Sequence, residues 1–125
     1  MTFKIIYSDL IEAFEVKTEG NMDAGDFIAM ARALLQDPCF LPNSNVLFDH
    51  TSLDFNEMSL DDLQKIRTFH NNNEENIGGG KSAIVVKRGL LGEWHRLWSK
   101  GKKIKTRNKV KVFENYDDAV KWILG

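Results

Sequence analysis

The side chains best suited to chemistry follow two short apolar runs. Residues 45–50 (NVLFDH) lead into hydroxyl and carboxylate side chains, and residues 81–87 (KSAIVVK) lead into a basic residue and a glycine. Ligands of open α/β sheets gather beyond the carboxyl ends of parallel strands. We therefore expect a ligand or partner edge where these runs end, formed by Asp49, His50, Thr51, Ser52, Asp54, Lys87, Arg88 and Gly89.

An enzyme could be built from this edge. His50 would be the general base, with Asp49 or Asp54 orienting its ring. Lys87 or Arg88 would then hold an anionic substrate. No glycine-rich loop or nucleophile elbow accompanies these residues, so we predict a non-catalytic protein.

A metal site is the second chemistry open to the same stretch. Carboxylates and a neutral imidazole are competent ligands, and here they would come from Asp49, His50, Asp54 and Glu57. Metal sites draw on more constrained spacings than this one, so we expect no metal and no cofactor. The single cysteine, Cys39, is interpreted as a small packing residue beside Pro38.

Residues 77–86 (IGGGKSAIVV) contain Gly-Lys-Ser, the last three letters of a phosphate-binding loop. The glycine that opens that signature would stand at position 75, which is Glu75. An apolar, β-branched run follows Ser82 where the signature requires a helix. The glycines are therefore expected to end a helix and turn the chain into a strand.

The composition fits one globular domain over residues 1–125. The chain is 42% hydrophobic and 28% charged, and its longest apolar runs are far too short to span a bilayer. We therefore expect no signal peptide, repeat or linker. A lone cysteine cannot form an internal disulfide, which fits a reducing cytoplasm.

Charge is divided unevenly along the chain. Residues 1–62 contain three Lys or Arg and twelve Asp or Glu, whereas residues 63–125 contain fourteen and six. The basic excess lies in residues 87–111, which could meet an anionic surface or balance the acidic half of the protein. No aromatic stacking pattern accompanies it, so we expect neither nucleic-acid binding nor stable membrane insertion.

Hydrophobic spacing divides the chain into alternating elements. Residues 2–8 and 10–18 predict two strands joined by a tight turn at Ser8 and Asp9, which makes an antiparallel hairpin. Helices and strands then alternate, so we predict an α/β fold with a mixed, mostly parallel sheet of about five strands and about four helices. The later strands are expected at residues 45–50, 81–87 and 109–114, and the helices at residues 22–38, 59–69, 90–98 and 115–124.

Two tryptophans share one face of the helix expected at residues 90–98. Trp94 and Trp98 are four residues apart, which places them one above the other. Such aromatics commonly seal a helix against a sheet. The alternative is that they line an apolar cleft or a dimer surface, and we include both residues in the candidate ligand or partner edge.

The order of elements and several of their sequences resemble the SpoIIAA-like branch of the STAS family. The resemblance covers essentially the whole chain and rests on VLFDHTSLDF, on SAIVVK, and on VF followed by DDAVKWIL near the end. It implies a small regulatory domain that acts by binding a protein partner or a second copy of itself. The runner-up is a binder or carrier of a small apolar or anionic ligand.

In anti-sigma factor antagonists of that family, a partner kinase phosphorylates a Ser or Thr in an Asp-Ser-Ser-Gly type turn before a helix. The nearest equivalent here is Ser59, in DFNEMSLDDL, and Thr51 is a second candidate phosphoacceptor. The glycine and the preceding Asp-Ser pair of that turn are absent. Ser59 and Asp62 also have the spacing of a capping box, which predicts that Ser59 caps the following helix.

Overall fold

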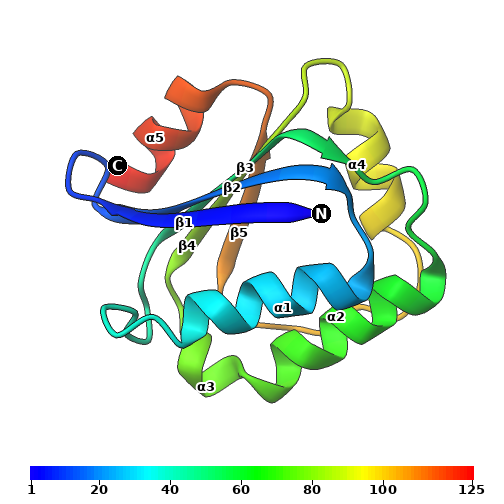
Figure 1. Cartoon of the computed structure of the whole chain (residues 1–125), viewed down its shortest axis with the longest axis horizontal. Helices are drawn as coiled ribbons and strands as arrows, with labels where there is room; N and C mark the ends of the chain where they lie inside the picture. Colours follow the sequence, from blue (N-terminus) through cyan, green and yellow to red (C-terminus); the bar gives the residue numbers. More distant parts are fainter.

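A five-stranded sheet forms the centre of the molecule (Figure 1). The computed structural model describes residues 1–125. Strand order follows the sequence, with the first two strands antiparallel and the others parallel, as predicted. The strands are β1 (Thr2–Ser8), β2 (Ala13–Asn21), β3 (Val46–Asp54), β4 (Lys81–Val86) and β5 (Lys109–Phe113).

Five helices surround the sheet, one more than the sequence predicted. The additional helix is a single turn that ends at Gly78, where φ is 73°. One turn is too short to produce a hydrophobic period, whereas the glycine after it was expected to end a helix. The helices are α1 (Ala24–Leu35), α2 (Leu60–Asn72), α3 (Glu74–Ile77), α4 (Leu91–Trp98) and α5 (Tyr116–Leu124).

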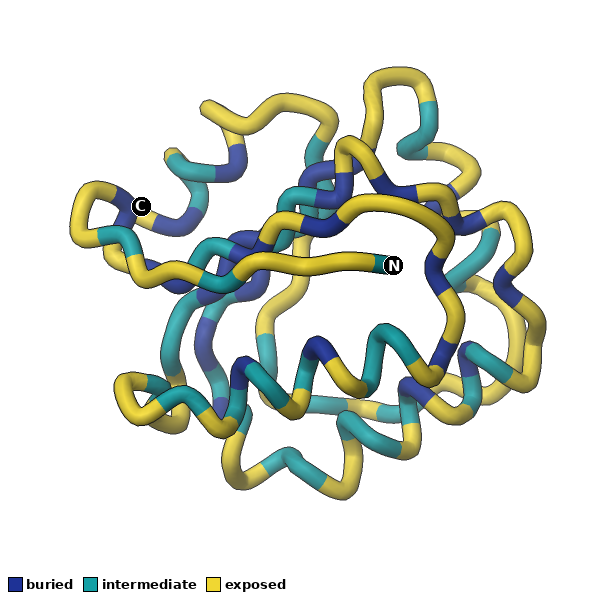
Figure 2. The backbone as a smooth tube through the Cα atoms, in the orientation of Figure 1, coloured by how far each residue is buried: buried dark blue, intermediate teal, exposed yellow.

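The hairpin connection is longer than the predicted turn at Ser8 and Asp9. Residues 9–12 join β1 to β2, and Glu12 has a positive φ of 53°. Ile11 is buried beneath α5 and therefore belongs to the core instead of to the strand. The edge strand β1 is largely exposed, as Figure 2 shows.

Helix α5 covers one face of the sheet, which we call the closed face. Successive strand residues point to opposite faces, so the odd-numbered residues of β4 meet α5. The buried residues there are small or aliphatic, and they are Ile11, Ala13, Leu47, Ala83, Val85, Ala119 and Ile123.

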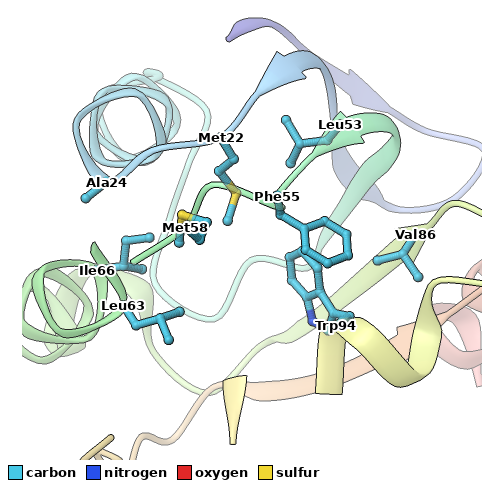
Figure 3. Packing of buried hydrophobic residues seen from close by; sticks show 9 residues of the cluster. All are labelled: Met22, Ala24, Leu53, Phe55, Met58, Leu63, Ile66, Val86 and Trp94. Carbon is cyan, nitrogen blue, oxygen red and sulfur yellow. The ribbon is translucent and has the colours of Figure 1, made fainter. Parts of the chain in front are cut away.

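Helices α1, α2 and α4 pack on the opposite face, which we call the open face. One cluster joins Trp94 of α4 to Leu63 and Ile66 of α2 through Phe55 and Met58 (Figure 3). A second cluster packs α1 on β2 and β3, with Met30 and Leu34 against Phe14, Val16 and Val46. These helices approach the sheet through side chains larger than those of the closed face.

Strand β3 is longer than predicted and irregular. It continues to Asp54, because its backbone pairs with β2 as far as Asn21. Two residues of β3, His50 and Thr51, lie opposite one residue of β2, Thr18. Such a bulge re-aims the side chains beyond it. Residues 51–54 thus belong to a strand, where the sequence predicted a loop.

Candidate functional site

The open face contains a cavity of about 420 Å³ between the sheet and the helices. Most of its lining residues are hydrophobic. Well-packed protein interiors leave few voids larger than a water molecule, and small-molecule sites occupy about 300 to 1,000 Å³. The apolar walls include Phe27, Phe48, Ile84, Trp94, Trp98 and Val112.

The segment after α4 closes one side of this cavity. Ile104, Thr106 and Asn108 line the cavity and are half-buried, whereas the alternating Lys103 and Lys105 are exposed. The Asn108 amide donates to the carbonyl of Gly80 at 2.8 Å, which fixes the segment beside β4. Part of the basic region seen in the sequence therefore forms a rim over an apolar space.

His50 is the most deeply buried ionisable residue of the cavity. Its side chain points inward from β3, and the residue is 1% exposed. The ring packs between Phe48 and Trp94, with centroid distances of 5.6 Å and 5.7 Å. Nδ1 lies 2.7 Å from the hydroxyl of Thr18. Burial lowers the pKa of His50 to about 4, with Asp49 opposing the shift, so the ring is neutral at pH 7.

Arg67 supplies the only permanent charge among the lining residues. Its guanidinium donates to the backbone carbonyls of Trp98 and Lys100 and lies 5.6 Å from the ring centroid of Trp98. No carboxylate lines the cavity. Partial burial lowers the pKa of Arg67, but a guanidinium remains charged at neutral pH. The cavity thus carries positive charge that no acidic side chain balances within its walls.

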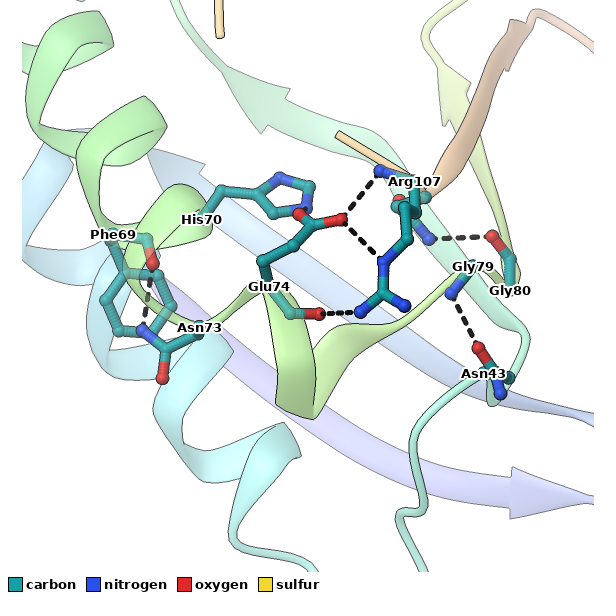
Figure 4. A network of polar contacts seen from close by, with 9 residues as sticks. Asn43, Phe69, His70, Asn73, Glu74, Gly79, Gly80 and Arg107 are labelled. Carbon is teal, nitrogen blue, oxygen red and sulfur yellow. Dashed lines mark hydrogen bonds and ion pairs between the residues drawn. The ribbon is translucent and has the colours of Figure 1, made fainter. Parts of the chain in front are cut away.

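A second polar cluster lies beside α3 (Figure 4). His70 lines the cavity, and its Nε2 stands 3.9 Å from the Glu74 carboxylate. The other oxygen of Glu74 accepts from the backbone amide of Arg107 at 2.7 Å. Burial lowers the pKa of His70, against the attraction of Glu74. This cluster ties α2 and α3 to the segment that leads into β5.

The structure divides the predicted ligand or partner edge. His50, Trp94 and Trp98 line the cavity. The remaining predicted residues do not line it, and these are Asp49, Thr51, Ser52, Asp54, Lys87, Arg88 and Gly89.

Asp49 points to the opposite face from His50. Its carboxylate accepts from the amide of Thr51 at 3.1 Å and from the hydroxyl of Thr51 at 2.6 Å. Asp54 instead accepts from the amide of Asn56. His50 is therefore oriented by a hydroxyl and not by Asp49 or Asp54, as the enzyme hypothesis required. No group of three or more His, Cys, Asp or Glu side chains is placed to hold a metal ion.

Ser59 caps α2, as its spacing predicted. Its hydroxyl accepts from the amide of Asp62 at 3.0 Å, and the Asp62 carboxylate accepts from the amide of Ser59 at 3.0 Å. The bond from the Ser59 amide lowers the pKa of Asp62. The serine is exposed at the surface. Phosphorylation at Ser59 or Thr51 stays a prediction.

Sequence reasoning missed Thr18 and Arg67. Thr18 is fully buried at the third inward position of β2, after Phe14 and Val16. The sequence does indicate this position, because Thr18 is a polar residue in a series of apolar residues that face inward. Arg67 gave no such signal, because its partners are backbone carbonyls more than thirty residues away.

The whole architecture matches a solved structure. The chain is similar to an uncharacterized protein of the DUF3478 family from Shewanella loihica PV-4, described as having a SpoIIAA-like fold. The two chains are 24% identical with a TM-score of 0.62, and the match covers 98% of this chain and 92% of the other. This chain has a SpoIIAA-like fold. The fold expected from the sequence resemblance is thus confirmed.

No protein-family model matches the sequence, and no curated protein is significantly similar to it. The helices of this SpoIIAA-like fold are also limited in length and apolar character. None of them could cross a bilayer.

Proposed function

We propose that this SpoIIAA-like domain binds a small, largely apolar molecule in the cavity of its open face. The observation that carries the proposal is the unfilled volume of about 420 Å³ within a chain of 125 residues. Phe48 and Ile84 lie on the inner strands β3 and β4, and Val112 lies beside them on β5, yet each is only half-buried. A ligand in the cavity would remove this apolar surface from water, at a gain of roughly 25 cal/mol for each Å².

Charge supports a neutral or anionic ligand over a cationic one. Arg67 is charged, the cavity walls hold no carboxylate, and Lys103 and Lys105 stand on the rim. Opposite charge raises both the local concentration and the association rate of a small anion. An apolar body with an anionic or neutral polar end therefore fits the site best.

Native mass spectrometry of the protein purified from its own cells, followed by denaturing mass analysis, tests the proposal. We expect a small molecule that accompanies the native protein and is lost on denaturation. The same spectra would reveal an added mass of about 80 Da from one phosphate at Ser59 or Thr51. A native protein with no bound molecule, combined with no uptake of apolar probes, would contradict ligand binding.

A filled cavity provides the matched test. Ala31 lines the cavity from α1, whereas Ala29 of the same helix is exposed and does not line it. Ala31→Phe should weaken binding of the fluorescent probe 1-anilinonaphthalene-8-sulfonate by about tenfold or more, because the added ring occupies the site. Ala29→Phe should leave the affinity unchanged. Equal affinities for the two variants would place the probe elsewhere.

The second candidate is a non-catalytic regulatory or protein-interaction module. The SpoIIAA-like fold favours it, as do apolar side chains on the hairpin at the sheet edge. Ile6, Tyr7 and Leu10 are 49%, 52% and 90% exposed. Unpaired edge strands are ready sites for association.

Analytical ultracentrifugation tests this second candidate. We expect wild-type protein to self-associate and Ile6→Lys to abolish the association. Leu41→Lys is the control, because Leu41 is 66% exposed but belongs to the loop between α1 and β3 and not to the hairpin. A monomeric wild-type protein at all concentrations would remove self-association from this candidate.

A further inference from the structure

His50 presents one unused hydrogen-bonding atom to the cavity. Nδ1 is held by Thr18, whereas Nε2 has no protein partner. The side-chain atoms that are sealed from solvent without a partner are Nε2 of His70, Oε2 of Glu74 and Nε1 of Trp98. Nε2 of His50 is not sealed in this way, and its ring borders the cavity. It is therefore the imidazole atom that a ligand can reach.

The hydroxyl of Thr18 determines which imidazole nitrogen carries the proton. This hydroxyl has one hydrogen and two acceptors within reach, the backbone carbonyl of Asp49 at 3.3 Å and Nδ1 of His50 at 2.7 Å. Only donation to Asp49 makes both contacts hydrogen bonds, because Nδ1–H of His50 then donates to the Thr18 oxygen. A neutral imidazole with its proton on Nδ1 leaves Nε2 as an acceptor.

We propose that the ligand of this cavity carries a hydrogen-bond donor, such as an alcohol or phenol hydroxyl, that donates to Nε2 of His50. The inference rests on the proposed ligand-binding function and specifies the chemistry of the ligand's inner end. A carboxylate has no proton to donate, so an anionic group belongs at the other end, toward Arg67 and the basic rim.

The environment of Nε2 makes this bond selective. The ring is enclosed by Phe48 and Trp94, and ligand binding would displace the water that can reach Nε2. A ligand without a donor would leave this acceptor buried and unpaired. Sites built to bond a hydroxyl reject analogues that lack one more strongly than apolar pockets reject a change of size.

Two probes of similar shape test the proposal. Calorimetric titration of the full-length protein with 2-naphthol and 2-methylnaphthalene compares a hydroxyl with a methyl group on the same rings. We expect 2-naphthol to bind about tenfold more tightly. Equal binding of both probes would overturn the inference and leave the proposed function intact. Binding of neither would overturn both.

Two hydroxyl deletions within the cavity region provide the matched control. Thr18→Val removes the group that holds Nδ1 and keeps the side-chain shape, whereas Ser82→Ala removes another buried hydroxyl that lines the cavity. We expect Thr18→Val to reduce the preference for 2-naphthol to about twofold without changing the affinity for 2-methylnaphthalene. Ser82→Ala should retain the tenfold preference. Loss of the preference in Ser82→Ala together with its retention in Thr18→Val would overturn the role of His50.

Nitrogen NMR of the imidazole provides a readout independent of binding. In the wild-type protein at pH 7, we expect a protonated Nδ1 and an unprotonated Nε2 for His50. Addition of 2-naphthol should shift the Nε2 resonance of His50, whereas addition of 2-methylnaphthalene should shift it less. A proton on Nε2 in the free protein would overturn the proposal, because that atom would then be a donor.

Discussion

The closed and open faces of the sheet pack against their helices in different ways. On the closed face, Ala83 of β4 meets Ala119 of α5, and both are fully buried. On the open face, Phe48 and Ile84 face the helices and remain half-buried around a cavity. Small side chains on both layers allow a helix to approach closely, whereas large ones hold the helices away from the sheet. The first arrangement stabilises the fold, and the second leaves space within it.

Neighbouring residues of β3 allow the largest test of this difference. Leu47 is fully buried on the closed face, and Phe48 points into the cavity. We expect Leu47→Ala to reduce the free energy of unfolding by about 4 kcal/mol and Phe48→Ala by about 2 kcal/mol, because one side of the Phe48 ring already faces empty space. Urea denaturation measures both. A greater loss of unfolding free energy for Phe48→Ala would mean that packing on the open face contributes more to stability than packing on the closed face.

Protonation of His50 on the open face should have the next largest effect on stability. The pKa of His50 is lowered from 6.5 in the unfolded chain to about 4 in the folded protein. As the pH falls, the unfolded chain takes up this proton first. The stability contributed by neutral His50 is complete above pH 6.5 and is lost as the pH falls toward 4, by about 3 kcal/mol in total.

Thermal unfolding between pH 7 and pH 4 checks this prediction. His70 acts in the same direction, because burial lowers its pKa as well. The informative quantity is therefore the difference in pH dependence between wild type and His50→Gln. His95→Gln is the control, since His95 is exposed on α4. An unchanged pH dependence in His50→Gln would contradict a buried neutral ring.

Removal of a helix N-cap should have the smallest effect on stability, and this effect should be the same on both faces. Ser59 caps α2 on the open face, and Asn115 caps α5 on the closed face through the amide of Asp118. We expect Ser59→Ala and Asn115→Ala each to cost about 1 kcal/mol of folding free energy, measured by urea denaturation. A cost confined to Asn115→Ala would show that helix ends of the open face contribute little to stability, and would extend the contrast beyond packing.

Local patterns predicted most of the fold. Alternation in residues 2–8 and the apolar run of residues 81–87 indicated strands. The capping-box spacing at Ser59 correctly predicted where α2 begins. The polar end of β3 was missed because backbone pairing holds it in the sheet without apolar side chains. The turn α3 was missed because four residues contain no period.

The candidate site was only partly predictable. His50 and the two tryptophans of α4 were selected from residue type and spacing, and they do line the cavity. The cavity itself depends on the distance at which α1 and α2 pack from the sheet, which no local pattern encodes. The bond between Thr18 and His50 joins residues 32 positions apart and requires the register of β2 with β3.

The bulge at His50 and Thr51 acts as a change of phase within β3. Up to and including His50, even-numbered residues such as Phe48 face the helices of the open face, whereas beyond Thr51 the odd-numbered Leu53 does. Deleting one residue here would restore simple alternation but force either His50 or Leu53 out of its environment. Because of the inserted residue, the first half of β3 lines the cavity on the open face and its second half packs in the hydrophobic core on that same face.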